Sequence, residues 1–355
     1  MQVNSWCAWL VAALAWGQAA SQAQVAIDCE PANKACLHEA IRSHVVRRPE
    51  FWRADFSRPL ADRIGNAPPQ LIEYVTLDNM KDDYPERPRA PLKDDAFIAD
   101  VRAAFAELPA SVQVLFERRL IGIYLLDELG GTGWTEVVRD GSSHPMGGMI
   151  VLDASVLKAR TANQWATWKE NTPFKPDPRW QLHARIEDAE RDTRRYAIQF
   201  ILLHELGHVL SIGSDVHPSW LIDPKDVDER ARFPFFELSW RTDRQRDRFF
   251  SLFDLTLARR DDVVYYFGAR LAASDMVPLH TTLEQTNFPT LYAATRPGDD
   301  FAESFASYVH TVLMRKPWEI TLSRDGQVTK TIKSCWEEPR CAAKRAVLEE
   351  VLRRP

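Results

Sequence analysis

The stretch FILLHELGHVLSIG, residues 200–213, constrains the fold of this chain more than any other segment. Its apolar residues surround nearly the whole circumference of a helix, and a helix of this kind is buried in the middle of a protein. We expect the helix to begin near Glu187 and to end at Gly213, because glycine readily adopts the left-handed conformation that caps a helix. The fold must therefore be built around this helix, although the stretch also carries ionisable side chains.

Three of these ionisable residues have the spacing of a metal site: His204, Glu205 and His208. Side chains four apart stand on one helix face, about 5 to 6 Å apart at Cβ, and two imidazoles so placed can bind one Zn²⁺ ion. Glu205 projects about 100° further round the helix, where it can reach a water on the metal without binding the metal. This is the H-E-x-x-H pattern of metallopeptidases, in which the Glu takes the proton of a zinc-activated water. We therefore predict two Zn²⁺ ligands and a general base.

Gly207 lies inside the same helix, where it costs about 1 kcal/mol relative to alanine. A missing side chain at this position predicts that another element, or a neighbour of the metal, comes close to the helix backbone.

A third ligand must come from elsewhere, and two known patterns fit poorly. The extended signature H-E-x-x-H-x-x-G-x-x-H is broken by Ser211 and Ser214, and His217 comes three residues too late. Glu229 lies at the separation expected of a thermolysin-like Glu ligand, but its surroundings, DVDERARFPF, lack the N-E-x-x-S-D pattern and are typical of a solvated charged turn.

The stretch YAATRPGDDFAESFASY, residues 292–308, fits better. It resembles a segment, roughly Y-A-x-T-N-x-x-E-x-F-A-E, of the gluzincins related to anthrax lethal factor and the clostridial Pro-Pro endopeptidases. In that family the tyrosine hydrogen-bonds the oxyanion, the first acidic residue binds zinc and the second supports the site from behind. By position, the resemblance implies these roles for Tyr292, Asp299 and Glu303. It covers only about residues 200–308.

The chain departs from that family at two positions of this segment. Asp299 is one methylene shorter than the usual Glu, and Arg296 replaces the usual Asn. Asp299 could instead cap the helix that follows Pro-Gly. Glu303 lies one turn further on the same face and is long enough to bind zinc itself. On length we favour Glu303 over Asp299 as the third ligand, and we expect both to lie near the metal.

The patterning predicts an α+β fold that is mostly helical, with a small sheet upstream of the H-E-x-x-H helix. LIGIYLLDEL, residues 120–129, and the run Met149 to Leu152 have the composition of strands. An edge strand there could pair with an extended peptide, although an interior strand is an equal alternative. We expect residues 243–272 to be helical. The sequence DGQ around Asp325 and Gly326 predicts a β-hairpin, followed by a helix over 339–352.

We divide the chain into four parts: a signal peptide at 1–23, a Pro-rich region at 24–94, a domain at 95–316 that the resemblance implies to be zincin-like, and a C-terminal hairpin and helix at 317–355. The first part has a short apolar run and small residues before a cleavage site, although it lacks Lys and Arg. The remaining cysteines form two close pairs, Cys29 with Cys36 and Cys335 with Cys341, which predicts two local disulfides in an oxidising compartment.

Composition narrows the partners of the protein. A formal net charge of -5 and a pI near 6.0 give no basic surface for nucleic acid. After signal cleavage we expect no stable membrane insertion, and the sequence leaves the oligomeric state open. We therefore predict an exported zinc metalloendopeptidase, periplasmic or secreted, that acts on peptides or proteins. Two alternatives remain: a zincin-fold binding protein that has lost catalysis, and a zinc hydrolase of a non-peptide amide.

Overall fold

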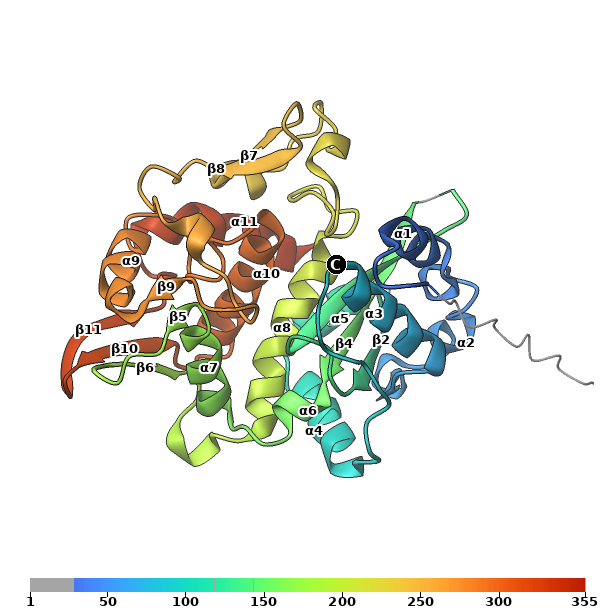
Figure 1. The fold of residues 1–355 in the computed structure, drawn as a ribbon, viewed down its shortest axis with the longest axis horizontal. Coiled ribbons are helices and arrows are strands. Elements are labelled where there is room, and N and C mark those ends of the chain that lie inside the picture. The colour runs from blue at the N-terminus through green and yellow to red at the C-terminus, as the bar shows by residue number, and fades with distance from the viewer. Residues whose placement is uncertain (1–28, 118, 143, 355) are drawn as a thin grey trace, which may run out of the picture.

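The computed structural model describes residues 29–117, 119–142 and 144–354 (Figure 1). The expected α+β class is confirmed, because many helices surround one four-stranded sheet and three smaller ones. The expected signal peptide at 1–23 lies outside the described residues. Within the described ranges, no helix is both long enough and apolar enough to cross a membrane.

The largest sheet has the strand order β1-β2-β4-β3. These strands span Ile64–Asn66 (β1), Leu120–Leu126 (β2), Gly133–Arg139 (β3) and Pro145–Asp153 (β4). β1, β2 and β4 run parallel to one another, whereas β3 pairs antiparallel with β4. The run Met149 to Leu152 is therefore an interior strand, between β2 and β3, and the edge nearest the helix with His204 and His208 is β3.

Both faces of this sheet are buried along β2 and the second half of β4, which explains their apolar runs LIGIYLL and MIVL. Alternate residues of β2 point to opposite faces, so that Ile123 and Leu125 join the central core while Tyr124 and Leu126 face the N-terminal region. That region contributes three helices: α1 (Lys34–Ser43), α2 (Arg53–Phe56) and α3 (Pro69–Lys81). Because it also contributes β1, the Pro-rich region is an integral part of the sheet layer.

The central core is organised around α8 (Arg194–Ser211), which runs through the middle of the molecule (Figure 1). It begins seven residues later than expected, and Gly213 follows it with a φ of +65°, as the left-handed cap requires. The helix is buried from Ala197 to its end. Its most extensive contacts are with β3, β4 and three helices: α4 (Asp95–Ala106), α7 (Ala162–Asn171) and α10 (Pro297–Tyr308).

The contact between α8 and α10 depends on Gly207. A Cβ atom at this position would lie 2.5 Å from the Cα of Ala302 in α10, which is too close for any side chain. The predicted close approach to the helix backbone is therefore confirmed. It brings the polar face of α10 against the histidines of α8.

Four further helices and seven further strands complete the α-helices and β-strands of the described residues. The helices are α5 (Ala110–Phe116), α6 (Ala154–Leu157), α9 (Met276–Leu283) and α11 (Ala342–Arg353). The strands β6 (Trp180–Arg185), β10 (Glu319–Arg324) and β11 (Gln327–Lys333) form one small sheet. Two further pairs are β5 (Phe174–Lys175) with β9 (Leu271–Ala272), and β7 (Trp240–Asp243) with β8 (Arg248–Ser251).

The C-terminal predictions are confirmed. β10 and β11 form a hairpin whose turn residues, Asp325 and Gly326, have φ angles of 49° and 79°. Disulfides join Cys29 to Cys36 and Cys335 to Cys341, so both local pairings are correct.

The helix expected over 243–272 is wrong. This segment holds β8, a series of turns and β9. Asp247 adopts a φ of +47° in the hairpin turn, and Leu255 is 97% exposed, so the apolar residues do not form one buried helical face. The buried Arg260 instead donates hydrogen bonds to the carbonyls of Ala294 and Thr295, which holds the irregular chain against the segment before α10.

Candidate metal centre

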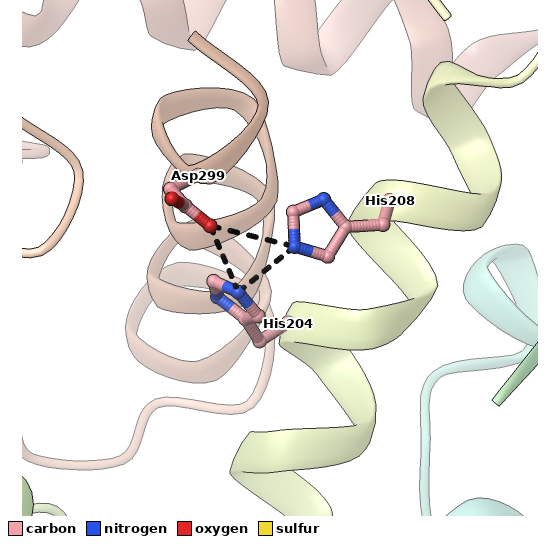
Figure 2. A group of neighbouring side chains, drawn as sticks. All are labelled: His204, His208 and Asp299. Carbon is pink, nitrogen blue, oxygen red and sulfur yellow. Dashed lines mark hydrogen bonds and ion pairs between the residues drawn. The ribbon is translucent and has the colours of Figure 1, made fainter. Parts of the chain in front are cut away.

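Three side chains from two helices converge beside the contact of α8 with α10 (Figure 2). His204 and His208 lie one turn apart on α8, and their Nε2 atoms are 3.1 Å apart. Asp299 comes from the first turn of α10, and its Oδ1 lies 3.9 Å from Nε2 of His204 and 3.6 Å from Nε2 of His208. All three residues are buried.

These distances fit a metal ion. Ligand atoms bound at about 2.0 to 2.2 Å in tetrahedral directions are separated from one another by roughly 3.3 to 3.6 Å. The three separations of 3.1, 3.6 and 3.9 Å bracket that range. Two imidazoles and a carboxylate are also the donor set of a catalytic zinc site with room for a further ligand. The group of His204, His208 and Asp299 could therefore hold a metal ion.

Glu303 lies near this group but faces a different atom of it. Its Oε2 is 2.8 Å from Nδ1 of His204, on the ring nitrogen opposite the one that faces Asp299. Lys169 and Thr290 donate hydrogen bonds to its Oε1, at 3.0 and 3.2 Å. Of the two competing acidic residues, Asp299 rather than the favoured Glu303 thus belongs to the converging group. The reason is that Glu303 lies one turn further along α10, level with Nδ1 of His204 and with the buried cation.

The protonation state of Glu303 depends on its burial and on its contact with Lys169. Burial opposes the ionised form of Glu303, but Lys169 and the hydrogen bond from His204 more than offset it and hold its pKa at about 2. Glu303 is therefore a carboxylate that can only accept hydrogen bonds. A carboxylate behind a ligating histidine fixes the tautomer and orientation of the ring.

His208 is oriented by stacking. Its ring centroid lies 3.7 Å from that of Trp220, at an interplanar angle of 27°. Its Nδ1 has no hydrogen-bond partner among the described residues. Stacking against the indole therefore restricts the orientation of the His208 ring, whereas His204 is also held by the hydrogen bond with Glu303.

Glu205 points from α8 towards the edge strand β3. Its Oε2 accepts a hydrogen bond of 2.8 Å from the hydroxyl of Thr135. A Cβ atom on Gly133 would lie 2.6 Å from its other oxygen, so the glycine leaves room for the carboxylate. Burial raises the pKa of Glu205 to about 7, which suits a group that must accept and release a proton near neutral pH.

Tyr292 lies over the ring of His204, with the two centroids 5.3 Å apart and the planes inclined by 27°. Burial raises the pKa of its phenol well above the usual value. The hydroxyl therefore keeps its proton and remains a hydrogen-bond donor. The other acidic candidate, Glu229, is exposed and pairs with Arg244, away from the histidines.

Next to these side chains, Trp220 covers the edge of β3 that does not pair with β4. The indole Nε1 of Trp220 donates a 2.9 Å hydrogen bond to the carbonyl of Thr135. The same indole lies against Gly298 of α10, where a Cβ atom would be 2.5 Å from the ring. Trp220 thus closes the space between the edge strand and the first turn of α10.

Sequence reasoning missed Lys169, Thr135 and Trp220. Each reaches the site through a long-range contact, and none stands in a pattern that indicates it. Gly133 carried a partial signal, because it stands in the glycine-rich stretch GGTGW, and a glycine in a strand often marks a close contact. No protein-family model, no curated protein and no solved structure matches this chain.

Proposed function

We propose that the protein is an exported zinc-dependent endopeptidase, active in the periplasm or the medium. The observation that carries this proposal is the position of Glu205, a buried carboxylate with a pKa of about 7, next to the group of His204, His208 and Asp299. A structural metal site needs no such base. The Tyr292 phenol beside His204 adds a hydrogen-bond donor for the charge that develops on a carbonyl oxygen.

In this mechanism the zinc ion supplies polarisation of the scissile carbonyl and a lowered pKa for a nearby water. Glu205 accepts the proton of that water as the water oxygen bonds to the carbonyl carbon. Tyr292 donates a hydrogen bond to the oxygen that becomes negative. Glu205 then gives the proton to the amide nitrogen as the C–N bond breaks, so that an acid and an amine are released.

The substrate class follows from β3, which is an edge strand next to Glu205. An extended peptide can add to such an edge through backbone hydrogen bonds, which places its carbonyls along the strand. This arrangement favours peptides over compact amides without an extended backbone. It also requires Trp220 to release the carbonyl of Thr135, because the indole N–H and an N–H of the added peptide would compete for this acceptor.

Chelation tests the proposal directly. Treatment with a strong zinc chelator should abolish cleavage of a peptide library, as measured by mass spectrometry, and added Zn²⁺ should restore it, because the water is activated only at a loaded site. A protein that binds zinc and peptides but cleaves none in either state would instead be a binding protein.

Replacement of Trp220 by phenylalanine should make the site easier to enter. The phenyl ring would keep an aromatic face against His208 but lose the donor to Thr135, so a peptide would no longer compete with that hydrogen bond. We expect KM to fall by about 2- to 10-fold, the value of one such bond, with kcat changed less. Trp180→Phe, on β6, is the matched control. An unchanged KM in Trp220→Phe would show that the substrate does not displace this contact.

A further inference from the structure

Lys169 is a buried cation that donates hydrogen bonds to two carboxylates, one at the metal centre and one next to it. Its side chain, on α7, is 4% exposed. Its Nζ lies 3.0 Å from Glu303 and 3.2 Å from Glu170. A buried charge is tolerated only when such partners compensate for the lost hydration. Burial lowers the pKa of Lys169, but the two carboxylates more than offset this effect, so that the residue stays charged.

Glu303 links this cation to the metal-binding helix. One of its oxygens accepts from Lys169 and the other faces Nδ1 of His204. Since the carboxylate can only accept, Nδ1 must carry the hydrogen, and Nε2 presents its lone pair towards His208 and Asp299. The orientation of Glu303 therefore decides which nitrogen of His204 is available to a metal.

The same cation also contacts the expected oxyanion donor. Nζ of Lys169 lies 4.5 Å from the centroid of the Tyr292 ring, within the range of a cation–π interaction. Tyr292 in turn stacks on His204. Lys169 thus touches two side chains that both pack against the same ligand.

We propose that Lys169 is a positioning residue of the metal centre, which sets the orientation of His204 through Glu303. The inference rests on the metal-binding part of the proposed function, and it goes further because it assigns a role to a residue on α7. Without the cation, the buried carboxylate loses its strongest partner and no longer holds His204 in one orientation. Partners of this kind are worth about 10- to 100-fold in metal affinity.

The test compares the zinc dissociation constants of folded variants, measured by competition with a chromophoric chelator. We expect Lys169→Met to bind zinc about 10- to 100-fold more weakly. Lys169→Arg, which keeps the charge, should recover most of that loss. Lys316→Met is the matched control, because Lys316 is also a buried cation, paired with Glu187 and Gln199 outside the metal centre. It should lose stability but keep its zinc affinity.

A double variant tests the route of the effect. If Lys169 acts through Glu303, adding Lys169→Met to Glu303→Gln should weaken zinc binding no further, because the effects of residues in one chain of contacts are not additive. This variant removes the buried Lys169–Glu303 charge pair, and Glu170 keeps the hydrogen bond from Tyr265, so it remains informative where Lys169→Met alone does not fold. Further weakening in the double variant, wild-type affinity in Lys169→Met, or equal losses in Lys169→Met and Lys316→Met would each overturn the proposal. A wild-type protein that binds no zinc would instead refute the proposed function itself.

Discussion

Glu205→Gln is expected to lower kcat for peptide cleavage by about 10²- to 10⁴-fold while leaving zinc bound. Glutamine has the same shape, and its amide oxygen can still accept the hydrogen bond from Thr135. It cannot take a proton from water, so the step that creates the nucleophile is lost. Cleavage is measured by mass spectrometry on a peptide library, and the metal content is measured on the same sample.

A matched control for this variant is Glu187→Gln. Glu187 is also buried, but its carboxylate pairs with Lys316 rather than with the edge strand β3. Its loss should affect stability and leave kcat near the wild-type value. Full activity of Glu205→Gln with zinc in place would contradict the proposed role of Glu205 as the base.

Asp299→Asn is expected to weaken zinc binding by more than about 100-fold, the upper value for partners that only support a ligand. The carboxylate whose oxygen faces both Nε2 atoms becomes a neutral amide, which is a poor ligand for zinc. Glu303→Gln should have the smaller effect, because its amide oxygen can still accept from His204. Zinc dissociation constants of both variants test this order.

The neighbouring residue Asp300 offers a close control for this order. It is also buried, but it accepts hydrogen bonds from Lys344 and Trp240 on the other side of α10. Asp300→Asn should therefore reduce the stability of the fold and keep the zinc affinity. The opposite ranking, with Glu303→Gln the more damaging change, would make Glu303 the ligand.

Local sequence patterns predicted the parts of the site that lie within one element. His204, Glu205 and His208 share one helix, and the spacing of the pattern fixes their relative positions. The choice between Asp299 and Glu303 is different, because it depends on how α10 is rotated and shifted against α8. That arrangement is set by the contact between Gly207 and Ala302, and no residue pattern within α10 contains it.

Long-range pairing explains what the sequence left open or missed. The run Met149 to Leu152 was recognisable as a strand, but its interior place depends on β3, which pairs with it from the preceding segment. Lys169 meets Glu303 across 134 residues of sequence, and such a pair leaves no local trace. The segment 243–272 has apolar residues that contact different neighbours, so their periodicity indicated a helix that does not exist.

The way in which β1 joins the large sheet has a consequence for limited proteolysis. Residues 64–66 pair with β2, and α1 and α3 cover one face of the sheet. Residues 29–81 are therefore attached to the rest of the protein by noncovalent contacts as well as by the peptide chain. A cut in the Pro-rich loop over 82–94 would therefore yield two fragments that remain together as one particle. Neither fragment would complete the sheet layer alone, so the severed chain would dissociate only when the fold itself is lost.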